Sequence, residues 1–251
     1  MPPGLFADLQ KILPNGTAHS PYGATESLPV ASISAAEVLG ETASATAAGK
    51  GTCVGRPVRE IELKIIAITD APIASLADTS ELPAGEIGEI IVRGPVVTKS
   101  YDELPEATAL AKVFDSQPGG PAAVWHRLGD LGYLDASGRL WFCGRKVERV
   151  TTARGVLYTE PCEQVFRAHP RATRCALIGL GTAPNQLPAI VLETAVRDSS
   201  EARALARLSH PNIVGLHDFG RTASGHLYIV MEHVAGADLS RLIRSGNLAV
   251  A

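Results

Sequence analysis

G-D-L-G-Y-L-D-A-S-G-R-L-W-F-C-G-R-K, residues 129–146, is the most informative segment of this 251-residue chain. Its apolar runs, Leu131–Leu134 and Leu140–Cys143, are separated by D-A-S-G, a pattern that predicts a β-hairpin because glycine readily adopts the positive φ of such turns. A carboxylate held on a tight turn, as at Asp130, can accept both hydroxyls of a ribose. The Arg145 guanidinium, directly after a predicted strand, can donate to the same sugar or to a phosphate.

The composition is that of an ordinary globular protein. Hydrophobic residues make up 45% and charged residues 20%, which excludes disordered, collagen-like and coiled-coil chains. A formal net charge of −3 supplies no basic field, so we expect no nucleic-acid partner. No apolar run reaches the ~18 residues of a membrane span, and the start shows no signal-peptide pattern. The four cysteines form no C-x-x-C pair and are expected to be small buried residues, so we expect a cytoplasmic protein.

The pattern along the chain predicts a mixed α and β (α+β) fold with a boundary near residue 197. Apolar spacing predicts a helix from Pro3 to Leu13, ended by P-N-G. The Ala/Ser/Thr/Gly-rich segment 31–51 and the segment 117–121 are expected to be loops. The remaining predicted helices are 105–113, 161–168, 201–208 and 238–244, and the remaining predicted strands are 61–68, 89–93, 175–180, 189–193, 213–219 and 227–232.

A second segment with chemical potential is Y-G-A-T-E at residues 22–26. An aromatic ring, a glycine, a hydroxyl and a carboxylate within five residues could stack on a base, donate to a phosphate and hold Mg²⁺. Taken alone, however, such a segment is more often an ordinary turn. Two further segments are Gly88–Pro95, which by itself predicts only a strand and is followed by Tyr101, and W-H-R-L-G-D at residues 125–130.

Together, and in this order, these segments and L-Y-T-E-P-C-E at residues 157–163 resemble the AMP-forming acyl-adenylate enzymes, which include the fatty-acid–CoA ligases. The similarity is greatest to the olefin β-lactone synthetase branch and covers residues 1–193. It implies a partial adenylate-forming enzyme fold, with the end of the large AMP-binding domain in residues 1–144. The start of the small C-terminal domain would occupy residues 145–196.

The resemblance also implies roles for individual residues, with ATP/AMP and Mg²⁺ as cofactors. A 3-hydroxy acid or a long-chain acyl substrate would be activated to acyl-AMP, with release of pyrophosphate. The implied roles are adenine stacking by Tyr22 beside Gly23, α-phosphate contact by Thr25, Mg²⁺ ligation by Glu26, ribose binding by Asp130 and closure on the nucleotide by Arg145. Thr25 and Glu26 form only part of a catalytic set.

Several positions depart from the family pattern. Leu128 stands where the family usually has threonine, and Val147 stands where it often has an aspartate at the domain hinge. No Gly/Ser/Thr-rich phosphate loop occurs in the 21 residues before Tyr22, and no lysine follows Lys146. Because phosphate-binding groups and a catalytic cation stabilise developing charge, we expect these residues to be a weakly active or inactive part of such a ligase.

Residues 197–251 resemble part of a bacterial Ser/Thr protein kinase N-lobe. The similarity is carried by E-A-R-A-L-A-R-L-S-H-P-N-I-V at 201–214 and L-Y-I-V-M-E at 227–232. It implies an αC glutamate at Glu201, a gatekeeper at Met231, adenine binding by the backbone of Glu232 and Val234, and ribose contact by Asp238. The glycine-rich loop, β3 lysine, H-R-D and D-F-G motifs are absent from these residues, so we expect no phosphoryl transfer.

Three hypotheses therefore stay open from the sequence. The chain is an adenylate-forming ligase of β-lactone synthetase type, a kinase-related protein with an unusual N-terminal extension, or a non-catalytic chimeric remnant. Because each partial fold would expose apolar surface, self-association is also expected.

Overall fold

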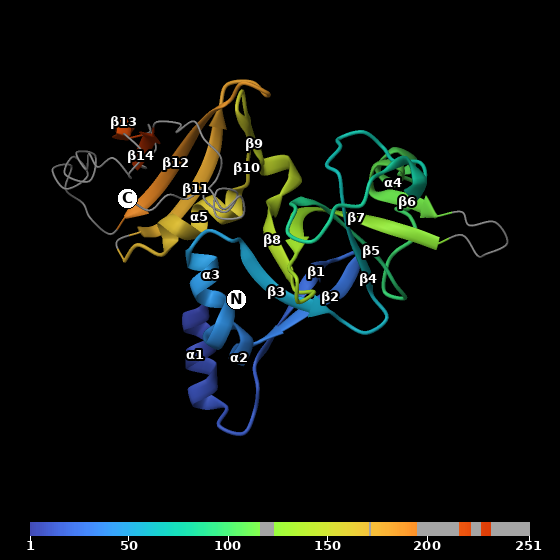
Figure 1. Cartoon of the computed structure of the whole chain (residues 1–251), viewed down its shortest axis with the longest axis horizontal. Coiled ribbons are helices and arrows are strands. Elements are labelled where there is room, and N and C mark those ends of the chain that lie inside the picture. The colour runs from blue at the N-terminus through green and yellow to red at the C-terminus, as the bar shows by residue number, and fades with distance from the viewer. Residues whose placement is uncertain (116–122, 171, 195–215, 222–226, 232–251) are drawn as a thin grey trace. The chain divides into compact units, whose positions relative to one another are not determined.

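The computed structural model describes residues 1–115, 123–170, 172–194, 216–221 and 227–231 (Figure 1). These residues divide into two compact units. The first contains residues 1–149 and 157–170, and the second contains residues 150–156 and the described residues after 171. Both helices and strands are present, so the mixed α and β prediction is confirmed.

The first unit is built on an eight-stranded sheet in which the neighbouring strands are antiparallel. The hairpin predicted from the sequence is formed by two neighbouring strands of this sheet, Ala123–Leu134 and Leu140–Arg145. In this hairpin Tyr133 pairs with Trp141. The spatial order is β1 (His19–Ala24), β2 (Ser27–Ser34), β3 (Thr52–Pro57), β8 (Leu140–Arg145), β7 (Ala123–Leu134), β5 (Gly88–Arg93) and β4 (Glu62–Ile66), with β6 (Lys112–Asp115) paired to β7.

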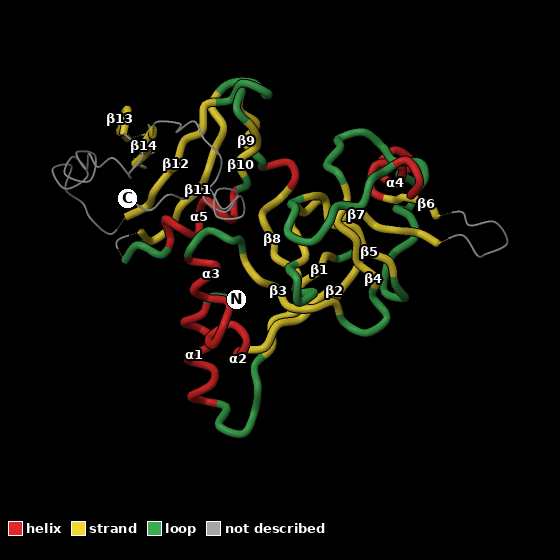
Figure 2. Tube along the Cα trace, viewed as in Figure 1, coloured by secondary structure: helices red, strands yellow, loops and turns green. Residues whose placement is uncertain are grey.

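Short helices accompany this sheet, as the colouring in Figure 2 shows. The α-helices are α1 (Pro3–Ile12), α2 (Ala35–Glu37), α3 (Ala43–Ala47), α4 (Pro105–Ala111) and α5 (Thr159–Arg167). A π-helical turn, Val38–Thr42, joins α2 to α3, and 3-10 turns occupy Leu76–Asp78 and Lys146–Glu148. The first helix agrees with the sequence prediction. The predicted helix at 105–113 ends earlier, because residues 112–115 form β6 instead.

The prediction of a loop over residues 31–51 was wrong. Strand β2 continues to Ser34, and an almost unbroken helical run follows from Ala35 to Ala47. Ser34 starts this run with a capping box, in which its hydroxyl accepts from the Glu37 N–H while the Glu37 carboxylate accepts from the Ser34 N–H. Val38, which is only 7% exposed, packs this run of helical residues against the core. The other residues of the run are mostly small and show little apolar periodicity.

Three groups of buried apolar side chains form the core of the first unit. One includes Phe6, through which α1 packs on the residues that follow β2. The groups are Val30, Ala31, Ile61, Ile65, Ile90, Val92, Leu128 and Leu140; Phe6, Ile33, Ala35, Val38, Cys53 and Trp141; and Ile66, Ile73, Ile91, Val113 and Trp125. Residues from β7 and β8 occur in these groups, so the hairpin that carries Asp130 and Arg145 is anchored in the core.

The second unit contains two antiparallel sheets. The first pairs β9 (Val150–Thr152) with β10 (Gly155–Leu157), and the second has the order β11 (Ala172–Leu180), β12 (Leu187–Thr194), β14 (Leu227–Met231) and β13 (Leu216–Arg221). Strand β14 pairs with β12, placing Val230 opposite Ala189. One sheet thus joins residues on both sides of the predicted boundary at 197, and the division of the chain into three parts stays a prediction.

Strands were predicted at each of the four positions of the larger sheet, and the part of the predicted strand 213–219 that precedes Leu216 lies outside the described residues. The predicted loop 117–121 and the predicted helices 201–208 and 238–244 lie outside the described residues. Cys53, Cys143 and Cys175 are buried, as expected from the sequence, and Cys162 is the least buried of the four cysteines.

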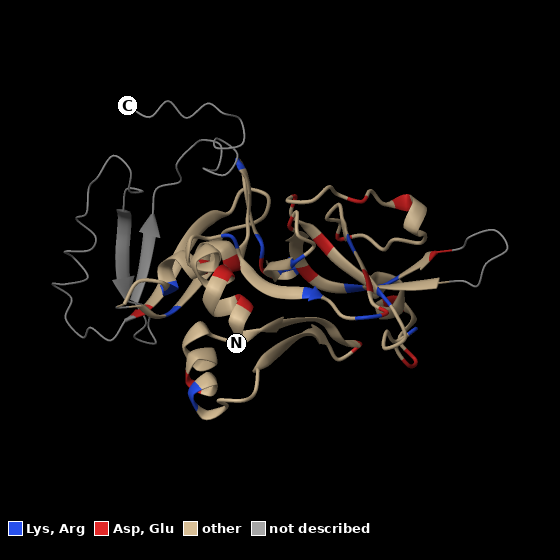
Figure 3. Ribbon diagram, turned by 60° about the horizontal axis from the view of Figure 1, so that its bottom comes forward, with Lys and Arg blue, Asp and Glu red and all other residues tan. Residues whose placement is uncertain are grey.

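The described surface carries both signs of charge. Acidic and basic positions are interspersed along the chain in Figure 3, in keeping with the near-neutral sum. Among the described helices, none is both long and apolar enough to cross a membrane.

Candidate functional site

The Y-G-A-T-E segment lies at the end of the β1–β2 hairpin. Ala24 pairs with Ser27, so Thr25 and Glu26 form a two-residue turn. Glycine is required at position 23, because a Cβ there would lie 2.4 Å from the Ser27 carbonyl oxygen. The turn leaves the Thr25 side chain exposed and the Glu26 side chain half-buried.

Asp130 and Arg145 face each other across the β7–β8 hairpin. They are register partners, and Arg145 Nη1 lies 2.6 Å from Asp130 Oδ1. The preceding Gly129 has φ +68°, a conformation that favours glycine and turns the chain immediately before the carboxylate. Arg145 also lies 3.4 Å from the Leu128 carbonyl oxygen, and its side chain is 53% exposed, so it can reach a ligand by a change of rotamer.

Tyr22 joins this pair. Its hydroxyl donates to Asp130 Oδ2 at 2.5 Å, so each carboxylate oxygen of Asp130 accepts one contact from a predicted site residue. Burial raises the pKa of Tyr22 well above its ordinary value, and the negative charge of Asp130 raises it further. The hydrogen bond and charge of Asp130 raise the pKa of Arg145. Tyr22 is therefore a neutral donor, and Arg145 stays positively charged at this site.

A hollow of about 230 Å³ lies beside this group. Glu26 and Arg145 line it, whereas Tyr22, Thr25 and Asp130 are not among its lining residues. The lining residues are Ala24, Glu26, Glu89, Tyr101, Leu110, Ala111, His126, Arg127, Leu128, Gly129, Arg145 and Lys146. Charged groups from β5, β7, β8 and the turn after β8, together with Tyr101 from the loop before α4, thus meet the end of the β1–β2 hairpin at one hollow.

Glu26 is held by Tyr101, whose hydroxyl donates to Glu26 Oε1 at 2.6 Å. This hydrogen bond lowers the pKa of Glu26, while burial and the same bond raise the pKa of Tyr101 to about 12. Glu26 is thus ionised at neutral pH. A magnesium ion is commonly held by one or two carboxylates together with substrate phosphates and water, so a single carboxylate at the hollow fits the predicted role.

A buried lysine supports the loop that carries Tyr101. Lys112 is 1% exposed, and its Nζ donates to the Thr98 carbonyl oxygen at 2.5 Å and to Thr98 Oγ1 at 2.9 Å. The Thr98 N–H donates to the Glu26 carbonyl oxygen, which links this loop to the β1–β2 turn. Burial lowers the pKa of Lys112, and burial followed by the Lys112 charge lowers the pKa of His126.

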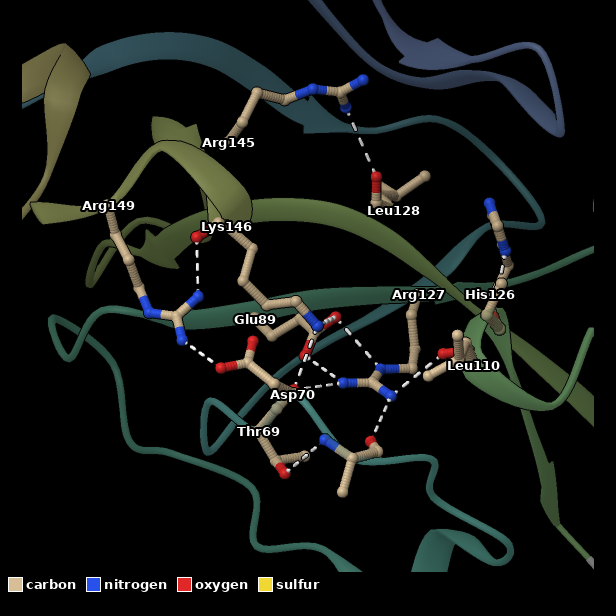
Figure 4. A network of polar contacts seen from close by, with 12 residues as sticks. Thr69, Asp70, Glu89, Leu110, His126, Arg127, Leu128, Arg145, Lys146 and Arg149 are labelled. Atoms are coloured by element: carbon tan, nitrogen blue, oxygen red, sulfur yellow. Dashed lines mark hydrogen bonds and ion pairs between the residues drawn. The ribbon is translucent and has the colours of Figure 1, made fainter. Parts of the chain in front are cut away.

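Three further residues that line the hollow, Glu89, Arg127 and Lys146, form a buried ionic cluster (Figure 4). Glu89 and Arg127 have side-chain exposures of 0% and 2%. Arg127 reaches both Glu89 oxygens, at 3.0 Å from Nε and 2.7 Å from Nη2, and Lys146 Nζ lies 3.0 Å from Glu89 Oε1. Two strands, β5 and β7, and the 3-10 turn that follows β8 are therefore joined at one carboxylate.

Sequence reasoning assigned no role to Glu89, Arg127, Lys146, Tyr101 or Lys112. A charge within the apolar run E-I-I-V of β5 was the available signal, because a fully buried carboxylate needs a cationic partner. The two residues that depart from the family pattern lie in different environments. Leu128 is packed in the core, and Val147 is 86% exposed. The kinase-derived residues Glu232, Val234 and Asp238 lie outside the described residues.

Comparisons with known proteins show which proteins this chain is similar to. Residues 1–102 match the AMP-binding enzyme family. The chain is 48% identical over 206 residues to an olefin β-lactone synthetase of Stenotrophomonas maltophilia, an alignment covering 82% of this chain and 37% of that protein. It is 44% identical over 229 residues to the Xanthomonas campestris olefin β-lactone synthetase, covering 88% of this chain and 41% of that protein. The chain thus spans about two fifths of the length of these relatives.

Solved structures of adenylate-forming enzymes share the fold. A mutant of the amide bond synthetase McbA from Marinactinospora thermotolerans aligns with a TM-score of 0.56 at 25% identity, covering 82% of this chain and 37% of that one. The o-succinylbenzoate CoA synthetase of Bacillus subtilis, in complex with its acyl-adenylate intermediate, aligns with a TM-score of 0.58 at 24% identity. That alignment covers 89% of this chain and 42% of that one, so the resemblance in fold is confirmed.

Proposed function

We propose that this chain carries the AMP-binding part of an acid ligase that activates a carboxylate by attack on the α-phosphate of ATP. Acyl-AMP and pyrophosphate would be the products. The observation that carries the proposal is the convergence of Tyr22, Asp130 and Arg145 from segments far apart in the sequence. A neutral phenol, a carboxylate and a mobile guanidinium are suited to the base, the ribose diol and the phosphate of a nucleotide.

Glu26 is the proposed magnesium ligand, and Thr25 the proposed phosphate contact. Glu26 is ionised and faces the hollow, and Thr25 is exposed beside it on the same turn. Bound magnesium would neutralise charge on the triphosphate. The part of this chain is to present one carboxylate, oriented by the Tyr101 hydroxyl, at the edge of the hollow.

The proposed acid is a 3-hydroxy acid, and a long-chain acyl group without the hydroxyl is the alternative substrate. The identities of 48% and 44% to two olefin β-lactone synthetases support this choice. In that branch the activated 3-hydroxy acid forms a β-lactone: its hydroxyl oxygen loses its proton and attacks the acyl carbon, and the bond from that carbon to AMP breaks. We propose a cytoplasmic location, as expected from the sequence.

Two alternative hypotheses stay open for residues 197–251: that they are related to a protein kinase, or that they are part of a non-catalytic chimeric remnant. Two observations favour the ligase reading for at least part of this segment. The alignment to the Xanthomonas campestris relative covers 88% of the chain, an extent that residues 1–196 cannot supply alone. In addition, β14 pairs with β12, which lies in the ligase-like region.

Isothermal titration with AMP and with MgATP tests the proposal directly. We expect weak binding of both ligands, with AMP about as strong as ATP, because these residues include no recognisable phosphate loop. The binding should be lost in Asp130→Ala. Absence of AMP binding at millimolar concentration would contradict the proposal, and a sub-micromolar ATP affinity would reveal a phosphate site outside the residues named above.

An ATP–pyrophosphate exchange assay tests the chemical step. We expect no exchange above background from this chain with 3-hydroxy or long-chain acids, because no lysine follows Lys146. Exchange that appears with a 3-hydroxy acid and disappears in Asp130→Ala would instead establish a working ligase and its acid class.

A further inference from the structure

We propose that Glu89 is a positioning residue that fixes the two chain segments bearing Asp130 and Arg145. It would act through Arg127 and Lys146, without touching the nucleotide. The inference rests on the proposed nucleotide site and assigns a role to the buried ionic cluster that flanks it.

The first observation is an irregularity in the pairing of β5 with β7. Glu89 pairs with Leu131, whereas Ile91, two residues further along β5, pairs with Arg127. Three residues of β7, Leu128–Asp130, therefore lie opposite the single residue Ile90. Such a bulge redirects side chains and is common beside functional sites. Here it carries Asp130 to its contacts with Tyr22 and Arg145.

Glu89 holds both ends of this bulge. Its backbone pairs with Leu131 at the far end, and its side chain binds Arg127 at the near end through two hydrogen bonds. Arg127 is held further by the carbonyl oxygens of Thr69, Ala71 and Leu110, at 2.6, 2.8 and 3.0 Å. The start and the end of the bulge are thus fixed to one buried residue.

The same carboxylate holds the segment that follows Arg145. Lys146 Nζ lies 3.0 Å from Glu89 Oε1 and 3.0 Å from the Thr69 carbonyl oxygen (Figure 4). Arg127 and Lys146 therefore share both Glu89 and Thr69 as partners. Each of these cations lies close in sequence to one member of the Asp130–Arg145 pair, so Glu89 couples the positions of both members.

The energetics favour a role in conformational specificity. Burying a carboxylate is costly, and well-packed apolar residues often stabilise a fold as well as a buried ion pair does. Hydrogen bonds in fixed directions, however, define one arrangement of the bulge, which apolar contacts would leave less determined.

Glu89→Gln tests this role, with Glu62→Gln as its matched control. Glu62 lies on neighbouring β4 and pairs with Arg93 in an exposed ion pair, so the control makes the same chemical change in the same sheet. We expect Glu89→Gln to accelerate amide hydrogen exchange about tenfold or more at residues 128–131 and 144–146, and little in the β1–β2 hairpin. AMP affinity should fall about tenfold, and the control should change neither quantity.

Glu89→Gln leaves two buried cations without their carboxylate, so the variant could fail to fold. Lys146→Met then carries the test, because it leaves the Glu89–Arg127 pair intact. We expect faster exchange at residues 144–146 with protection of 128–131 retained. Unchanged exchange at 144–146 in Lys146→Met would overturn the proposal.

In a folded Glu89→Gln variant, two results would overturn the proposal: unchanged exchange at the bulge, or faster exchange spread evenly through the first unit. If the unmodified chain binds no AMP, the proposed function fails. The exchange pattern still decides the positioning role of Glu89 in that case.

Discussion

Tyr22 and Asp130, separated by 108 positions in the sequence, share a 2.5 Å hydrogen bond in which the tyrosine hydroxyl donates to the carboxylate. The other oxygen of Asp130 accepts from Arg145. Asp130 is therefore the common partner of two residues expected to bind a nucleotide. A ribose hydroxyl that binds Asp130 must share these oxygens or displace the exposed arginine.

Removal of the charge at this common partner should weaken nucleotide binding most. For Asp130→Asn we expect AMP affinity to fall about tenfold, which corresponds to ~1.4 kcal/mol. Tyr22→Phe removes only one neutral donor, so its effect should be smaller, about 1 kcal/mol or less. Asp8→Asn in exposed α1 provides the matched control. Titration calorimetry measures all three, and equal losses in Asp130→Asn and Asp8→Asn would contradict the assignment.

The turn of the β7–β8 hairpin should give the chain a distinct acid sensitivity. Burial alone raises the pKa of Asp135, but hydrogen bonds from Trp141, Arg139 and Ser137 outweigh it and lower the pKa to about 2 from its ordinary 3.8. A lowered carboxyl pKa stabilises the fold above the unfolded-state value, and this contribution is lost as the pH falls from about 4 towards 2. A shift of this size corresponds to at most ~2.4 kcal/mol of stability.

Asp135→Asn should therefore reduce the free energy of unfolding at pH 7, and the difference from the unmodified chain should shrink towards pH 2. Urea unfolding at a series of pH values measures this difference, with Asp8→Asn as the exposed reference. A gap that stays constant from pH 7 to pH 2 would show that the loss is one of packing rather than of charge.

The sequence predicts the parts of this site that depend on local patterns. The D-A-S-G turn predicted the hairpin, and the ordered motifs pointed to Tyr22, Asp130 and Arg145. The ionic cluster could not be predicted in the same way. Glu89 meets Arg127 only because β5 and β7 pair with a bulge, and this register depends on the assembled sheet.

The helical run after β2 was missed for a different reason. Its residues are mostly small, so the apolar periodicity that marks most helices is weak there. The available signal was S-A-A-E at residues 34–37, a capping-box sequence at the end of a strand. Local side-chain to backbone hydrogen bonds carried more information in this segment than hydrophobicity did.

Ser34→Ala should measurably destabilise the first unit. It removes the hydroxyl that accepts from the Glu37 N–H, and N-cap serine substitutions typically cost ~1 kcal/mol. The loss should be larger than for Ser75→Ala, which removes a similar cap from the exposed three-residue turn Leu76–Asp78. Urea unfolding of both variants compares them. A Ser75→Ala loss equal to that of Ser34→Ala would mean that the helical run adds little to the stability of the unit.

Substitution of two glycines, one at a time, can distinguish the stability of the β7–β8 hairpin from its role in nucleotide binding. Gly129 and Gly138 have nearly equal φ values, +68° and +73°, and a Cβ at either position would meet no neighbouring atom within 4 Å. Substitution by alanine should therefore cost each variant a similar ~1 kcal/mol of backbone strain. Only Gly129 immediately precedes Asp130, so Gly129→Ala alone should also weaken AMP binding, because relief of the strain displaces the carboxylate. Thermal unfolding of both variants measures the loss of stability, and AMP titration measures the loss of binding. If Gly138→Ala lost as much AMP affinity as Gly129→Ala, binding would depend on the stability of the whole hairpin rather than on the geometry at Asp130.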